Sequence, residues 1–141
     1  ILGWERKRAD ARATELLDAA IAAAQSRGLA VAICPIATGF PSDIPSTLSF
    51  LRARSAIGLV VEPAALLTAS MLETAQVHLE RVKSSLLSHD RLVGLVLSSI
   101  RWVDGAATRC ALADGEIPAR DLERLNVEIP AQIWVATVQK A

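Results

Sequence analysis

The pattern of apolar and polar positions along the chain predicts helices separated by strands. Helices are indicated by apolar residues at helical spacing, and strands by short continuous apolar runs. Residues 4–27 carry an apolar stripe at helical spacing and end at Gly28, so we expect a helix there. Short continuous apolar runs rich in Val and Ile are typical of strands that are buried on both faces of a parallel sheet. Such runs occupy residues 29–37, 57–61, 91–100 and 129–138.

The segments between these strands predict further helices and one excursion. The longest helix is expected over residues 64–87, where apolar residues recur at helical spacing, and a shorter one over residues 47–54. Residues 101–117 are expected to form an irregular or hairpin excursion, in which Asp104-Gly105 is a hairpin-type turn signal. A last short helix follows this excursion.

The order of these elements predicts a single α/β domain over residues 1–141, with residues 1–27 as its N-terminal helix. Because strands alternate with helices, we expect a three-layer architecture joined by right-handed crossovers. Its centre is a mainly parallel sheet of about four or five strands, with helices on both faces.

The composition fits a globular domain and excludes a strong charge field. The 141 residues are 52% hydrophobic, and 15 Lys and Arg balance 15 Asp and Glu. Without a net charge nothing draws nucleic acid, so we expect a protein partner or a homodimer and no nucleic acid. Membrane contact is expected only through a segment that precedes residue 1, since no apolar run reaches about 18 residues and the chain has no initiator Met.

The cysteines and histidines indicate neither a disulfide nor a metal site. Cys34 and Cys110 lie far apart and belong to no CxxC pair. We therefore expect two buried free thiols and a cytoplasmic, reducing compartment. Neither His78 nor His89 has a second ligand at i+3 or i+4, so no metal is predicted.

The large aromatic and basic side chains are scattered. Trp134 lies within a predicted strand and is expected in the core, whereas Trp102 beside the excursion is a candidate for a partner surface. The dispersed basic residues are interpreted as a solvated face, because no aromatic residues interleave with them. They are Arg52, Arg54, Lys83, Arg91, Arg101 and Arg109.

Candidate cofactor-binding residues follow the predicted strands, because open α/β sheets bind ligands beyond the carboxyl ends of their strands. The carboxylate of Glu62 suits a ribose, a metal or a base edge, but an acid that complements a helix N-terminus is the favoured interpretation. Ser98 and Ser99 end the third strand and suit a nucleotide. Thr38-Gly39 form a small-residue turn that suits either a phosphate or a plain corner.

No catalytic residue is predicted. The chain contains neither a GxxxxGK[ST] nor a GxGxxG motif. The serines at the end of the third strand have no His with the right partners, so they are poor candidates for a nucleophile.

Four segments together resemble the latter part of the MinD/ParA-type (CobQ/CobB/MinD/ParA) P-loop ATPases. They are LLDAAIAAAQSRGLAVAICPIATGF, LRARSAIGLVVEPAALLTASMLETAQVHLERV, RLVGLVLSSIR and IPARDLERLNVEIPAQIWVATV. In that family a strand ends in a DxPxG switch loop, and a later strand ends in a VxxP-like turn before a long helix. The next strand reads like VLNR, and a short helix and a strand follow. The resemblance covers residues 16–138 in this order.

The chain departs from this family at the phosphate site. The family's phosphate-binding loop and signature lysines have no counterpart here. Cys34 stands where the family has the switch-loop Asp, and Ser98-Ser99 stand where Asn-Arg usually contacts the base. Positioning of water, Mg²⁺ and the γ-phosphate needs such groups. The resemblance therefore implies a fold without ATP hydrolysis.

Two hypotheses remain open. In the first, the chain is a non-catalytic MinD/ParA-like domain without a cofactor, which acts in protein–protein interaction or self-association within a larger bacterial assembly. In the second, it is the C-terminal portion of a nucleotide-binding ATPase that uses ATP and Mg²⁺ and whose P-loop half is absent from this chain. Packing of the helix at residues 4–27 over the sheet would favour the first, and a bare apolar edge strand would favour the second.

Overall fold

A parallel sheet forms the centre of the molecule. The computed structural model describes residues 2–126 and 129–138. In this part of the chain, four strands pair in the order β1-β2-β3-β6, and all neighbours are parallel. The strands are β1 (Val31–Ile33), β2 (Ile57–Val61), β3 (Leu92–Leu97) and β6 (Trp134–Thr137). The predicted α/β class with a mainly parallel sheet is therefore confirmed.

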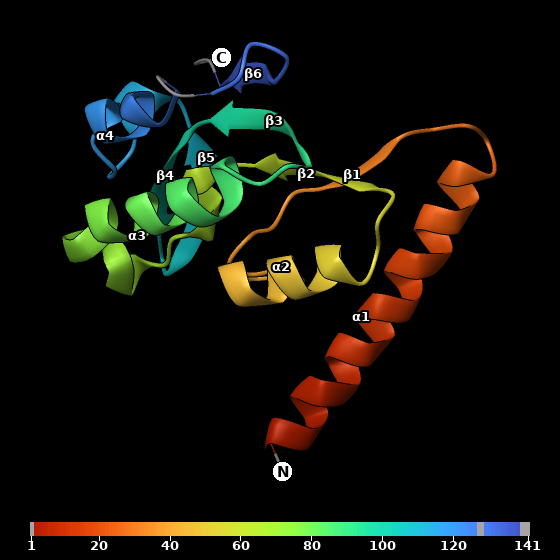
Figure 1. Cartoon of the computed structure of the whole chain (residues 1–141). Coiled ribbons are helices and arrows are strands. Elements are labelled where there is room, and N and C mark those ends of the chain that lie inside the picture. Colours follow the sequence, from red (N-terminus) through yellow and green to blue (C-terminus); the bar gives the residue numbers. More distant parts are fainter. Residues whose placement is uncertain (1, 127–128, 139–141) are drawn as a thin grey trace.

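Helices pack on one face of this sheet. α3 (Ala75–Val82) and α4 (Ala119–Glu123) lie together on that face, and α2 (Ile44–Arg52) lies at its β1 end (Figure 1). The side chains of alternate strand residues meet these helices and form the core, since successive residues of a strand point to opposite faces. The fully buried members include Leu51, Leu59, Val61, Leu79, Leu86, Leu95 and Leu122.

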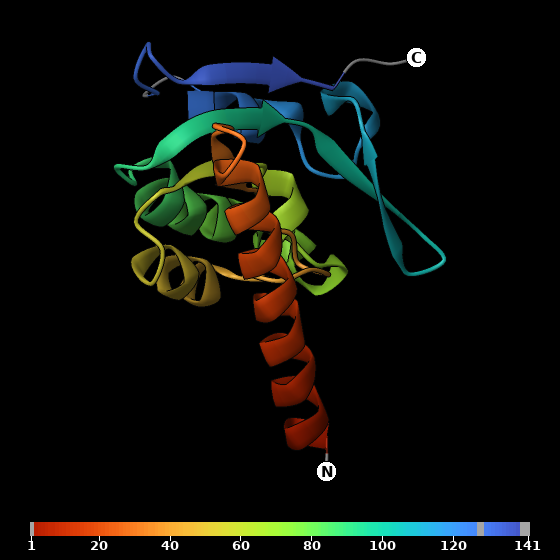
Figure 2. The same ribbon diagram turned by 90° about the vertical axis from the view of Figure 1, so that its right-hand side faces the viewer.

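The opposite face of the sheet, which we call the open face, has small and apolar side chains. The strand register places Val60 beside Gly94, and Gly94 beside Trp134. Val93 lies over Gly58 on the same face. Figure 2 shows β6 without a helix packed on this side in the described part of the chain. The open face comprises Ala32, Gly58, Val60, Val93, Gly94, Val96, Trp134 and Ala136.

The long helix predicted over residues 64–87 is interrupted. Residues Pro63–Leu66 and Ala69–Thr74 form two 3-10 turns, and regular α-helix begins only at Ala75. Between the turns, Leu67 and Thr68 are extended, with ψ of 146° and 163°. The prediction of one continuous helix was therefore wrong, because apolar spacing persists across a stretch in which the backbone leaves the helical region.

The N-terminal helix α1 (Leu2–Gln25) lies beside α2 and extends away from the sheet (Figure 1). Leu17 and Ile21 pack against the core from one side of α1. Asp18 accepts two hydrogen bonds from Arg54, at 2.5 and 2.8 Å, which also lower the pKa of the Asp18 carboxyl. Leu16 on the other side is 64% exposed. α1 is thus held by its own domain along only one side.

A hairpin follows the third strand. β4 (Ser99–Val103) and β5 (Ala106–Cys110) pair antiparallel around a two-residue turn. Asp104 and Gly105 in this turn have φ of 51° and 79°, the left-handed conformation that a type I′ turn requires. The third strand ends at Leu97, earlier than the expected residue 100, because the chain turns there into the hairpin.

Two expectations about burial were wrong. Trp134 is 49% exposed instead of lying in the core, because it stands on an edge strand and faces the open face. Cys34 is exposed and Cys110 is half-buried, so the two thiols are not both core residues. Within the described residues, no helix combines the length and the apolar composition that a membrane crossing requires.

Candidate functional site

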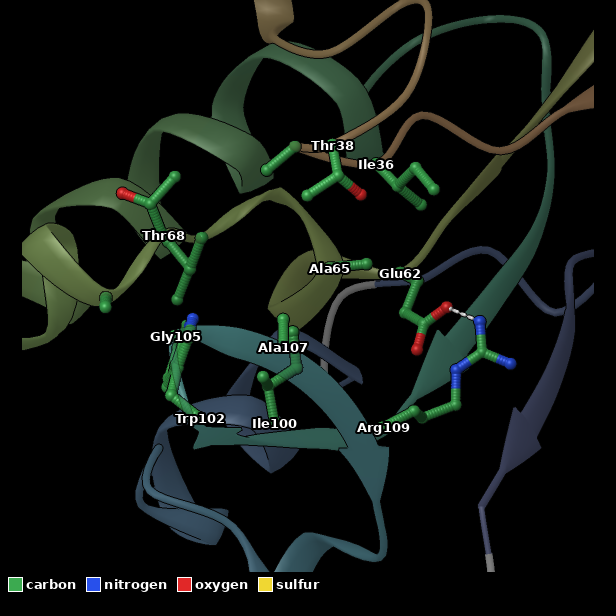
Figure 3. A pocket seen from close by; sticks show the side chains of 13 residues that line it. Ile36, Thr38, Glu62, Ala65, Thr68, Ile100, Trp102, Gly105, Ala107 and Arg109 are labelled. Carbon is green, nitrogen blue, oxygen red and sulfur yellow. Dashed lines mark hydrogen bonds and ion pairs between the residues drawn. The ribbon is translucent and has the colours of Figure 1, made fainter.

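A cavity of about 370 Å³ lies beyond the carboxyl ends of β1 and β2 (Figure 3). This is the edge of an open α/β sheet where ligands are expected to bind. The hairpin forms one wall, and the loops after β1 and β2 form the others. The walls are mostly aliphatic, and the residues that line the cavity include Ile36, Thr38, Glu62, Ala65, Leu67, Thr68, Ile100, Trp102, Ala107 and Arg109.

Glu62 is the charged group that is buried in this site. It follows Val61 at the end of β2, immediately before Pro63, and is only 1% exposed. Its Oε1 accepts a hydrogen bond of 2.5 Å from the hydroxyl of Ser98, and its Oε2 binds Nη2 of Arg109. Both carboxylate oxygens therefore have partners.

Arg109 neutralises this buried carboxylate from the hairpin. An unpaired buried carboxylate would be strongly destabilising, so a cation within contact distance is needed. The side chain of Arg109 is 56% exposed, whereas that of Glu62 is 1% exposed. The ion pair therefore joins the buried carboxylate to an exposed side chain at the edge of the cavity, and it attaches β5 to the end of β2 (Figure 3).

The structure places the other sequence-predicted candidates differently. Thr38 lines the cavity with Glu62. Gly39 lies in the adjoining tight turn, where its N–H donates to the carbonyl of Ile36 at 2.9 Å and an added Cβ would lie 2.7 Å from the Ile36 side chain. Ser99 is fully buried, and its hydroxyl donates to the carbonyl of Ile117 at 3.3 Å. Thr38, Glu62 and Ser98 are thus brought together, while Ser99 is bound elsewhere.

Cys34 follows β1 at the same edge of the sheet. Partial desolvation of its thiol raises the pKa of Cys34, and the nearby carboxylate of Glu62 raises it further. The guanidinium of Arg109 acts in the opposite direction on this pKa. The sulfur is therefore mainly a neutral thiol at pH 7, since the thiolate forms only at higher pH.

Sequence reasoning missed Arg109 as a member of this site and grouped it with solvated basic residues. The pair Arg109–Glu62 is separated by 47 positions, so no local pattern connects the two. One usable signal existed: Glu62 directly follows a buried apolar strand, and a carboxylate in such a place needs a cation from another element.

Within the described residues, no group of three or more His, Cys, Asp or Glu side chains is placed to hold a metal ion. Comparison of the chain with models of protein families, with curated proteins and with solved structures finds no significant match. The resemblance to MinD/ParA-type ATPases therefore remains a prediction from the sequence.

Proposed function

We propose that the chain is a non-catalytic α/β domain of MinD/ParA type that self-associates, with a second copy of the chain covering the open face. In this proposal it serves as an assembly module within a larger bacterial complex. The observation that carries the proposal is an apolar face of a parallel sheet with no helix packed at its β3 and β6 end in the described residues (Figure 2). The exposed edge strand β6 is also what the ATPase-fragment hypothesis expects, so the experiments below are chosen to separate the two. Val93 and Trp134 on that face are 40% and 49% exposed.

Parallel sheets are normally covered on both faces, because their strands carry apolar side chains in both directions. Gly58 and Gly94 leave the centre of the open face without side chains of its own. The indole of Trp134 fills the space above Gly94, where an added Cβ would lie 2.2 Å from the ring. Val93 lies over Gly58 in the same way, so apolar side chains form the outer surface of the open face and suit burial against an apolar helix side.

The same chain supplies a helix surface that fits this description. Leu16, Ala20 and Ala23 follow one another at helical spacing on the exposed side of α1. They face away from the side on which Leu17 and Ile21 pack. The exposed apolar side of α1 in one copy could therefore pack on the open face of a second copy.

The exposed surface area of the chain supports a second copy as the partner that covers the open face. The chain exposes 8815 Å², about a quarter more than the area expected of a compact monomer of 15.0 kDa. A stable dimer removes about 800 Å² from each partner, which is less than this excess. In the dimer, α1 of one copy would supply the helix layer that the other copy lacks. The three-layer arrangement with helices on both faces is thus proposed for the dimer.

The absence of catalysis is supported by the occupied polar groups at the carboxyl edge. The carboxylate of Glu62 is bound by Ser98 and Arg109, and the hydroxyl of Ser99 is bound by the carbonyl of Ile117. These hydrogen bonds join elements of the fold to one another, which is the structural role that the proposal assigns to Glu62, Ser98 and Ser99.

Two matched charge substitutions test the proposal. Val93→Glu places a carboxylate on the open face, whereas Val77→Glu places it on α3, where Val77 is 53% exposed. We expect light scattering after gel filtration to give a dimer for the wild type and for Val77→Glu, and a monomer for Val93→Glu. A Val93→Glu variant that remains fully dimeric would refute the open face as the interface.

Thermal unfolding in the presence of ATP and Mg²⁺ tests the nucleotide hypothesis separately. The proposal predicts no shift of the midpoint temperature. A ligand at ~100 times its dissociation constant would otherwise add about 2.7 kcal/mol of stability. A clear shift with ATP would replace this proposal by the alternative of a nucleotide-binding ATPase fragment.

A further inference from the structure

We infer that the cavity beside Glu62 binds a small carboxylate that carries an aliphatic body, with Arg109 as the contact for its head group. This inference does not depend on self-association, because the cavity lies at the carboxyl edge of the sheet and contains no residue of the open face. Its volume of about 370 Å³ lies within the range of small-molecule sites, about 300–1,000 Å³.

The walls of the cavity select an apolar body. Ile36, Leu67 and Ile100 contribute branched aliphatic side chains, and Ala65 and Ala107 leave the space between them open (Figure 3). The uncharged polar side-chain groups in this lining are the hydroxyls of Thr38 and Thr68 and the indole N–H of Trp102. Water in such a cavity is poorly satisfied, so an aliphatic chain or ring gains free energy by displacing it.

The Glu62–Arg109 pair determines which charge the head group of the ligand should carry. Arg109 already neutralises the carboxylate of Glu62, so the pair offers a ligand ammonium no uncompensated negative charge. The guanidinium has five N–H donors, and Glu62 is the acceptor recorded for it among the described residues. With 56% of its side chain exposed, Arg109 holds its remaining donors at the edge of the cavity beyond Glu62, where the head group of a bound ligand would meet them (Figure 3).

A carboxylate matches these donors better than an alcohol does. Arg and carboxylates form charge-assisted, often bidentate hydrogen bonds, which are roughly twice as strong as neutral ones. Glu62 keeps the guanidinium in place while the ligand binds on its exposed side. Glu62 is therefore a positioning residue, and Arg109 is the residue that contacts the ligand.

Nuclear magnetic resonance titration of the ¹⁵N-labelled chain tests this inference with three eight-carbon probes: octanoate, octan-1-ol and octylammonium. We expect saturable shifts with octanoate at Thr68, Ala107 and Arg109, and binding at least about tenfold weaker for octylammonium. Equal or tighter binding of octylammonium would overturn the inference. So would octanoate shifts confined to Val93 and Trp134, because those residues belong to the open face.

Two variants and a control complete the test. Arg109→Gln should weaken octanoate about tenfold and leave octan-1-ol unchanged. Arg109→Gln also leaves Glu62 without its cation, so a second variant, Ala107→Phe, tests the inference independently. The added ring fills the cavity and keeps the ion pair, and it should abolish binding of both probes. Arg101→Gln on β4, outside the cavity, should bind octanoate like the wild type. Unchanged octanoate binding by Ala107→Phe would overturn the inference, whether or not Arg109→Gln folds.

Discussion

Arg109 near the base of the hairpin and Glu62 at the end of β2 form an ion pair across 47 positions of the chain. The carboxylate is 1% exposed and the guanidinium is 56% exposed, so the pair links the interior to the surface. This asymmetry determines the expected effects of removing each partner.

Arg109→Gln should destabilise the domain by about 2 kcal/mol, because it leaves a buried carboxylate without its cation. Urea unfolding monitored by circular dichroism measures this change. Arg101→Gln is the matched control on the same hairpin: Arg101 is exposed and donates to the carbonyl of Asp114, so its loss should cost less than about 1 kcal/mol. Equal effects of the two substitutions would contradict the role of the ion pair.

Ser98→Ala should cost about 1–2 kcal/mol, since Oε1 of Glu62 then loses its hydroxyl donor in a buried setting. Ser88→Ala removes a serine hydroxyl from an exposed position, where it donates to the carbonyl of Ser84, and should change stability by less than about 0.5 kcal/mol. The same unfolding assay compares the two. A Ser98→Ala variant as stable as Ser88→Ala would show that Glu62 does not depend on this donor.

Cys34 should react slowly with iodoacetamide near pH 8. Partial desolvation and the carboxylate of Glu62 raise the pKa of its thiol, so the reactive thiolate is a smaller fraction there than in an ordinary cysteine. In a Cys110→Ser background, the pH of half-maximal alkylation should be higher for the folded chain than for the same chain unfolded in urea. A folded-state midpoint at or below the unfolded one would contradict the assigned surroundings of Cys34.

Gly94→Ala should destabilise the domain by about 1–3 kcal/mol. The added Cβ would lie 2.2 Å from the indole of Trp134 on the neighbouring strand, so the ring must move. Gly58→Ala is a milder change, because its Cβ would lie 3.1 Å from Val93. If the clash is the cause, Trp134→Ala should remove most of the penalty of Gly94→Ala in a double-mutant cycle. Additive effects would exclude contact between the two positions as the cause.

Leu16→Glu should weaken the proposed dimer, because it charges the exposed side of α1. Ala22→Glu is its control on the same helix, since position 22 lies about 120° around the axis from Leu16. Both residues are exposed, and Leu and Glu have similar helix propensities, so the monomer should keep its fold. Gel filtration with light scattering should give a monomer for Leu16→Glu and a dimer for Ala22→Glu; the reverse result would exclude this side of α1.

The parallel sheet and its order of elements follow from the sequence because they depend on local periodicity. Valine-rich and isoleucine-rich runs mark β1, β2 and β3, and Asp104-Gly105 marks the hairpin turn. The prediction of one continuous helix over residues 64–87 was wrong for a local reason as well. Apolar residues keep helical spacing through Leu67 and Thr68, although the backbone is extended there.

The candidate site was predictable only in part. Glu62 and Thr38 follow strands and were found by that rule. The partner of Glu62 was not, because Arg109 reaches it through tertiary structure and resembles any other exposed arginine in the sequence. The exposure of Trp134 depends on which element covers the sheet, a property of distant contacts that the apolar pattern of its own strand does not encode.

Sedimentation equilibrium of the whole chain, from about 1 μM to about 1 mM, tests the central claim most directly, because weak and tight dimers both form in this range. Self-association through the open face predicts a mass that rises to twice the 15.0 kDa of one chain for the wild type and stays at 15.0 kDa for Val93→Glu. A wild-type mass of 15.0 kDa at every concentration would contradict it.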